Sequence, residues 1–423
     1  MPEVIDRSFN LGDFLTSSTL QGKLGLVVGT LLLGCYPIIG TSTVILDIPS
    51  TPVSISYRAV YLLLSIYVLV VELPKISYRR IPLGVVLLSA FWVAYSLRLL
   101  YDFYVVNLDR GYARKGVLYF FQYGLGGCFI PALMVGLIQD RIDFIKLRKW
   151  VRRAFVFSCV FILVYIYVTI GLNITIFYRR IELGEDSVIG PILMSQIGGG
   201  LLVLTVMEKL LYRNGNIWVL LQGALGVVIL IMGGSRGPVV STIFVIVLLA
   251  FQSFKWSYLS LNYWSRIIAG LVVLSAAVVT YVVPNIKSFV LFNRINQTIG
   301  KGAGLDERNM QWTAAWNQFL RSPVVGDQII EDAFWFYPHN FILEVLMSTG
   351  VIGGFFVLTL LVLWAYKFIN RQAIPLEKWW VLYFMIVFFG YAFFSQPLVN
   401  QTHLWVLLTL GACIPLYQRK QTE

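Results

Sequence analysis

Residues 340–366 read NFILEVLMSTGVIGGFFVLTLLVLWAY, an apolar run in which Glu344 is the one charged residue. A helix of about 20 apolar residues crosses the hydrocarbon core of a bilayer, so this stretch predicts a membrane-spanning helix. The rest of the chain is similar: 58% of the 423 residues are hydrophobic and 13% are charged. A soluble domain carries roughly a quarter charged residues. We therefore expect lipid to surround most of this protein.

The same reading along the chain predicts an all-α fold with about twelve spans in a single transmembrane domain, 1–423. The candidates are roughly 24–44, 54–73, 81–105, 116–138, 154–173, 188–207, 216–234, 237–254, 267–285, 340–366, 379–396 and 402–418. The first run is long enough to span and is expected to be a retained helix rather than a cleaved signal. The seventh and eighth runs meet at Gly234-Ser235-Arg236-Gly237.

The net charge of +12 does not indicate nucleic-acid binding, because the basic residues lie mostly in short segments between the apolar runs. Six of them lie between Arg141 and Arg153. Cytoplasmic segments of membrane proteins carry such an excess, which favours an orientation with both termini on the cytoplasmic side of the membrane.

Two connections on the outer side are long, about 173–187 and 286–338. The second is a large outer loop between the ninth and tenth spans, and it contains a short predicted helix over about 305–320. Trp312, Trp316, Phe319 and Leu320 share one face of that helix, a pattern typical of helices that lie on a membrane surface.

His339 follows Pro338 and directly precedes the tenth span, so we expect it in the first turn of that helix at the outer face. The helix dipole there favours a neutral imidazole, the form that accepts a proton as a general base. The alternative is a polar helix-end residue that bonds to a loop. The other histidine, His403, is expected to serve helix-end packing.

Several arginines on the outer side are candidates for holding phosphate, because guanidinium is always charged and binds phosphate oxygens in a forked geometry. They are Arg179, Arg180, Arg236, Arg294 and Arg308. The alternatives are snorkelling of Arg236 to the headgroups, attraction of the Arg179–Arg180 pair to the lipid surface, and an ion pair of Arg308 with Asp306 or Glu307.

Glu344 is a costly residue inside an apolar run, which suggests a function. It would orient His339, pair with an arginine or bind acceptor hydroxyls; an acid satisfied by a neighbouring helix is the alternative. Asn340 would cap the helix or orient the histidine. The four cysteines lie in apolar runs, and no cluster of His, Cys and carboxylates has the spacing of a metal site. We expect no metal and no cofactor.

The run HNFILEVLMSTGVIG (339–353) resembles the O-antigen ligase superfamily, which also contains polymerases of O-antigen and other surface polysaccharides. Its pattern is His-Asn, nine residues, Gly, two residues and Gly, and the match is complete. The Ser235-Arg236-Gly237 turn and the Ser322-Pro323-Val324-Val325-Gly326 turn agree with the same family. Gly350 and Gly353 are expected to let the helix approach a neighbouring helix closely.

The resemblance implies a glycosyltransferase similar to the GT-C type, active in lipopolysaccharide biosynthesis. Such proteins move a glycan from undecaprenyl pyrophosphate to an acceptor hydroxyl at the periplasmic face of the bacterial inner membrane, without metal or nucleotide. The large outer loop would then be periplasmic. His339 would be the general base, and Arg180 (or Arg179) with Arg236 would hold the pyrophosphate. Asn340, Glu344, Arg308 and Arg294 would bind substrate.

Three functions stay open. The first, which the complete histidine signature favours, is an O-antigen ligase, whose acceptor is lipid A–core. The second is a polymerase that joins carrier-linked repeat units. The third, of another class, is a transporter or flippase of lipid-linked glycans. The charged candidates gather on the outer face rather than at mid-membrane, which favours a reaction at the surface over transport.

Overall fold

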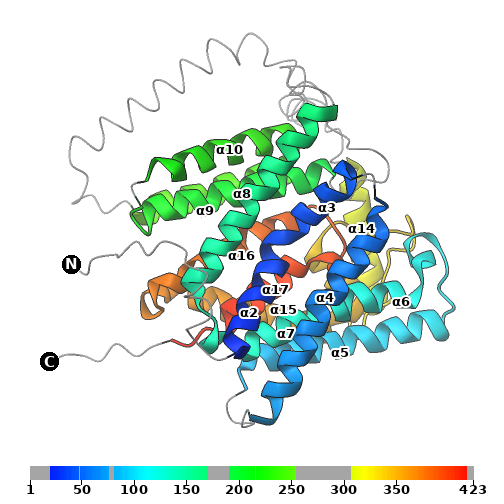
Figure 1. The fold of residues 1–423 in the computed structure, drawn as a ribbon. Coiled ribbons are helices and arrows are strands. Elements are labelled where there is room, and N and C mark those ends of the chain that lie inside the picture. The colour runs from blue at the N-terminus through cyan, green and yellow to red at the C-terminus, as the bar shows by residue number, and fades with distance from the viewer. Residues whose placement is uncertain are drawn as a thin grey trace.

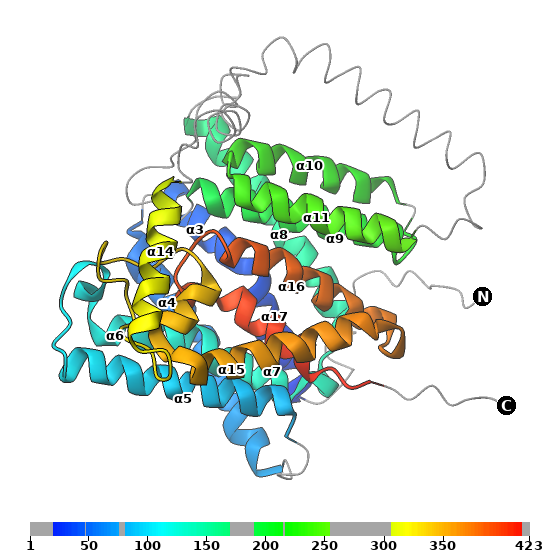
Figure 2. The same ribbon diagram turned by 180° about the vertical axis from the view of Figure 1, so that it is seen from behind.

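The computed structural model describes residues 20–46, 48–75, 81–169, 190–214, 216–253 and 306–416. These ranges form helices, and their one β contact is an isolated bridge between Glu331 and Phe336. Figures 1 and 2 show the helices packed into one bundle, with α17 (Thr402–Cys413) near its centre. Every residue of α17 from Leu404 onward is buried.

The helices follow the apolar runs of the sequence, since each run must close its backbone hydrogen bonds internally when it lies in lipid. In chain order they are α2 (Leu20–Thr30), α3 (Tyr36–Ile45), α4 (Ser50–Glu72), α5 (Leu83–Tyr104), α6 (Gly116–Phe120), α7 (Ile130–Leu137), α8 (Phe144–Thr169), α9 (Pro191–Leu210), α10 (Ile217–Gly233), α11 (Arg236–Ser253), α14 (Asp306–Arg321), α15 (Phe341–Ile369), α16 (Trp379–Ala392) and α17. π-Helical segments join α2 to α3 and α6 to α7.

Within the described ranges, six helical segments are long and apolar enough to cross a membrane: Pro52–Glu72, Leu83–Tyr104, Gly111–Leu137, Phe144–Tyr167, Pro191–Leu210 and Phe341–Ile369. The prediction of an all-helical, multi-pass membrane protein is therefore confirmed. The ninth predicted span, 267–285, lies outside the described residues, so the total of twelve stays a prediction.

One end of the bundle gathers basic side chains that pair with acids on neighbouring helices. Glu208, near the C-terminal end of α9, bonds to Arg148 and Arg152 of α8 at 3.1 and 3.3 Å. Glu72, at the C-terminal end of α4, pairs with Arg141. We call this the basic end. Because α4 and α9 both finish here, their N-terminal ends lie toward the opposite end.

α14 lies at that opposite end, which we call the α14 end (Figure 2). It packs on α15, and the Trp312 ring lies 6.2 Å from the ring of Phe393, which follows α16. Ala315 and Gln318 are buried, whereas Trp316 and Leu320 are 44% and 55% exposed. The bundle thus covers one side of α14 and leaves an apolar stripe with Trp316 and Leu320 exposed on another side. Contact of that stripe with a membrane surface stays a prediction.

Candidate functional site

The segment that leads to His339 is fixed by a break in α15. Gly350 has φ 61° and ψ −158°, a conformation that only glycine adopts readily. The turn 322–326 inserts at the break: the Asp327 N–H donates to the Met347 carbonyl at 2.9 Å, and the Val351 N–H donates to the Pro323 carbonyl at 2.8 Å. Gly350 thus opens the helix to a loop, in place of the close helix–helix packing expected from the sequence.

Glycine is needed on both sides of this contact. A Cβ at Gly326, whose φ is +78°, would meet the backbone of Ser348, and a Cβ at Gly350 would meet the backbone of Val324. The Ser-Pro-x-x-Gly turn and the glycine of the histidine motif, 24 positions apart, therefore form one structural unit.

The rest of the loop is held by α14 and α5. Gln318 donates from its amide to the carbonyls of Gln328 and Ile330, at 3.3 and 3.0 Å, and accepts from the Asp332 N–H at 3.0 Å. Arg321 bonds to Asp327 and Asp332, each at 2.5 Å. The buried carboxylate of Asp102 accepts from the Ile329 N–H at 2.7 Å. The path of the chain into His339 is therefore set before any ligand arrives.

His339 ends this loop in an unusual backbone conformation, with φ 53°. It precedes Asn340, the N-cap of α15, and so lies just outside the first helical turn in which the sequence placed it. Its ring lies 4.5 Å from the Tyr337 ring and 5.5 Å from the Phe336 ring. Nδ1 is buried, without a hydrogen-bond partner among the described residues. Burial and the nearby charge of Arg308 lower the pKa of the imidazole to about 4. At neutral pH the ring is therefore uncharged and able to accept a proton.

Asn340 and Glu344, which follow His339 in the chain, help to fix the backbone around it. The Asn340 side chain caps α15, because its Oδ1 accepts from the N–H groups of Ile342 and Leu343 at 3.1 Å. Glu344 is 2% exposed, and both of its oxygens accept from the Leu398 N–H at 3.0 Å. These contacts make Glu344 an anchor for the turn between α16 and α17, as in the alternative of an acid satisfied by its neighbours.

Arg236 and Arg308, far apart in the sequence, line one cavity of about 50 Å³. Arg236 begins α11 two residues after Gly234, which ends α10 in a left-handed conformation. Arg308 comes from the first turn of α14 and is also the arginine that acts on the pKa of His339. Ile192, Ser235 and Phe394 line the same cavity. Two of the predicted arginines thus line one cavity, and one of them, Arg308, is near enough to the predicted histidine to lower its pKa.

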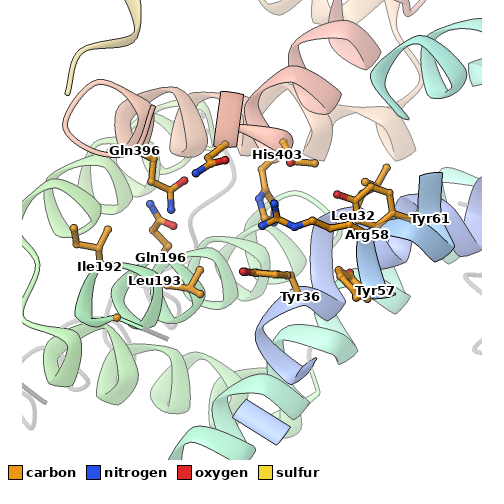
Figure 3. A pocket seen from close by; sticks show the side chains of 13 residues that line it. Leu32, Tyr36, Tyr57, Arg58, Tyr61, Ile192, Leu193, Gln196, Gln396 and His403 are labelled. Atoms are coloured by element: carbon orange, nitrogen blue, oxygen red, sulfur yellow. The ribbon is translucent and has the colours of Figure 1, made fainter. Parts of the chain in front are cut away.

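A larger cavity, of about 230 Å³, lies beside it and shares Ile192 with it. Figure 3 shows Arg58 of α4 next to His403 of α17, with the Tyr36 hydroxyl close by and with Gln196 and Gln396 near one another on the side away from Arg58. Asn400, Thr402 and Tyr57 complete the polar wall. His403 also stacks on Phe388, at 4.5 Å between ring centroids.

The sequence did not single out Arg58 or Gln196, because each stands alone within an apolar run. The position of Arg58 inside an apolar run could have identified it as a candidate, because charged residues are costly in lipid and often mark functional sites. The expectation that His403 serves only packing is incomplete, because its ring also lines this cavity.

Both cavities adjoin the N-terminal ends of helices. Gly190 and Ile192 are at the start of α9, Arg236 starts α11 and Thr402 starts α17. The free N–H groups and the dipole at helix N-termini favour anions. Within the described residues, no group of three or more His, Cys, Asp or Glu side chains is placed to hold a metal ion. The predicted Arg179, Arg180 and Arg294 lie outside the described residues.

Residues 222–358 match the family model described as O-antigen ligase. That range contains Arg236, Arg308 and His339. It also contains Gly350 at the α15 break and Gly326 of the turn that packs against it. The resemblance to the O-antigen ligase superfamily is therefore confirmed. Comparisons with curated proteins and with solved structures find no match.

Proposed function

We propose that this chain, which carries the O-antigen ligase match over residues 222–358, transfers a glycan from undecaprenyl pyrophosphate to the hydroxyl of lipid A–core. The family match supports ligase- or polymerase-type chemistry in general, and the choice of acceptor is our inference. The fold would be of the GT-C type with about twelve spans. The loop 286–338, which includes α14, would lie on the periplasmic side, and both termini in the cytoplasm.

The observation that carries the proposal is His339, which is uncharged because burial and the nearby Arg308 lower its pKa, and whose Nδ1 has no hydrogen-bond partner among the described residues. Arg308 also lines a cavity together with Arg236. In the reaction, His339 takes the proton of the acceptor hydroxyl while that oxygen attacks the anomeric carbon of the donor sugar. The bond from that carbon to the pyrophosphate breaks, and Arg236 and Arg308 hold the charge that gathers on the leaving group. Arg179 or Arg180, and Arg294, would add to this charge from segments outside the described residues.

The donor would supply its own activation, because pyrophosphate is a good leaving group. The protein then contributes mainly by positioning the two substrates and by stabilising charge. Neither task needs a metal ion or a nucleotide. Asn340 and Glu344 would act through the backbone that they hold rather than by touching the substrate.

Reconstitution with two acceptors tests the proposal. Purified protein in proteoliposomes receives a carrier-linked glycan together with lipid A–core, or the carrier-linked glycan alone. Glycan on lipid A–core is the expected product. A longer glycan that stays on the carrier would instead identify a polymerase. Movement of the carrier-linked glycan across the bilayer without either product would replace the enzyme by a flippase.

A further inference from the structure

We propose that the cavity between Arg58 and His403 is a second binding site for a phosphate group, separate from the cavity of Arg236 and Arg308. The proposal does not depend on the transfer reaction. It rests on a cation inside a span, on the polar wall opposite that cation and on the two helix ends that adjoin the cavity.

Arg58 lies within the span Pro52–Glu72, where a charge needs compensation. Among the described residues no carboxylate is paired with it. Its guanidinium instead lies over the Tyr123 ring, 3.8 Å from the centroid, and 5.5 Å from the Tyr36 ring centroid. Aromatic faces attract a cation without removing its charge. A positive charge is therefore kept at the wall of a polar cavity and stays available to an anion.

The wall opposite Arg58 is rich in donors. Figure 3 shows the amides of Gln196 and Gln396 on the far side of the cavity from Arg58. Gln396 has a φ angle of 67°, a backbone conformation that costs energy for residues other than glycine. Such strain persists where the surrounding structure fixes it, and here it places an amide on the cavity wall.

Two helices begin at this cavity. Ile192 and Leu193 in the first turn of α9 line it, and so does Thr402, the first residue of α17. The positive ends of both helix dipoles therefore adjoin the space that Arg58 faces. Guanidinium, amide donors and two helix N-termini together form the environment of an oxyanion. The cavity volume of about 230 Å³ is roughly that of eight waters in the liquid, which is enough for a phosphate or diphosphate group.

Phosphate could come from two sources, the carrier diphosphate or the phosphorylated acceptor. Because the two cavities share Ile192, a ligand at Arg58 would lie next to one at Arg236. The chemistry of the site is the same in both cases, and the experiment separates them.

The first test is the titration of inorganic pyrophosphate into the full chain in phosphatidylcholine nanodiscs, followed by calorimetry at low salt. Arg58→Gln should weaken binding at one site by about 10- to 100-fold, the effect of losing a charged hydrogen-bond donor. Arg58→Lys keeps the positive charge but loses the forked pair of N–H donors of the guanidinium. This variant should weaken binding by about three- to tenfold. That variant carries the test if Arg58→Gln does not fold. Arg114→Gln changes an exposed arginine and is the matched control.

The second test repeats the titration with undecaprenyl pyrophosphate, with phosphorylated lipid A–core and with its dephosphorylated form. Weaker binding of the carrier to Arg58→Gln assigns the site to the donor. Weaker binding of the phosphorylated acceptor alone assigns it to the acceptor. If Arg58→Gln and Arg58→Lys bind every probe as well as Arg114→Gln does, the site does not exist. Failure of glycan transfer by the wild-type protein would leave these binding results unaffected.

Discussion

His339 combines two properties that a general base in this position needs. Its ring is uncharged at neutral pH because burial and Arg308 lower its pKa, and its backbone is held at φ 53° by a loop with many fixed contacts. A left-handed conformation at a residue other than glycine is uncommon and is often found at functional sites. The histidine itself was predictable from its place before an apolar run, whereas this conformation depends on contacts with α14 and α5.

His339→Gln should lower the rate of glycan transfer by about 10²- to 10⁴-fold, the usual effect of removing a general base. Glutamine can still donate and accept hydrogen bonds but cannot take the proton. Transfer is measured in proteoliposomes, and binding of the carrier is measured separately and should be unchanged. A variant that keeps more than a tenth of the wild-type rate would exclude His339 as the base.

Arg308→Gln should raise the pKa of His339, since the positive charge of Arg308 is one of the two causes that lower it. In the wild type the ring stays neutral down to about pH 4; in the variant it should become protonated at a higher pH. Diethylpyrocarbonate, which modifies neutral imidazole, gives the midpoint when its rate is followed against pH. His339→Gln supplies the background from His403, and an unshifted midpoint would show that the two side chains do not interact.

Among the elements, α15 departs most from its sequence pattern. The apolar run predicts one continuous span, but the helix opens at Gly350, and beyond it the N–H groups of Val351 and Ile352 donate to carbonyls of the turn 322–326. Periodicity could not show this, because Gly350 continues the apolar run and its partner turn lies more than 20 residues earlier. The family pattern located both glycines, and the structure gives their physical reason.

Gly350→Ala should destabilise the protein by about 1–3 kcal/mol or more, because alanine disfavours this backbone conformation and its Cβ would meet the Val324 backbone. Gly354→Ala is the matched control. Gly354 is in a helical part of α15, where a Cβ would meet only the end of the Leu346 side chain. Thermal unfolding in detergent should therefore show a clear loss for Gly350→Ala and little change for Gly354→Ala. Equal effects would remove the break as a structural requirement.

At the scale of the whole molecule, composition was enough to predict a helical membrane bundle. It could not bring Arg236, Arg308 and His339 together, since that depends on how α11, α14 and α15 pack. The two ends of the bundle also differ in a way that the charge pattern anticipated. The basic end contains Arg141, Arg148 and Arg152, and the α14 end contains the two cavities.

The proposed orientation predicts which positions a membrane-impermeant maleimide reaches. Arg114→Cys changes an exposed residue close to Tyr112, whose N–H donates to the Trp335 carbonyl at the α14 end. Lys146→Cys lies near the basic end, at the start of α8. With Cys35 replaced by serine and the other three cysteines buried, the reagent should label position 114 in intact spheroplasts and position 146 only after lysis. The reverse pattern would invert the topology and place His339 in the cytoplasm.

The break at Gly350 also divides α15 into a part that faces protein and a part that faces lipid. As one helix it is roughly 44 Å long, well over the ~30 Å of a hydrocarbon core. Every exposed large apolar side chain of α15 lies at or beyond Val351, and the part from 351 to 369 is roughly 28 Å long, which matches the core. Lipid therefore surrounds only the part of α15 that follows the break. The part before the break is surrounded by the rest of the protein. A change in bilayer thickness is then absorbed by residues 351–369 through tilt, while the ten residues beneath His339 keep their surroundings.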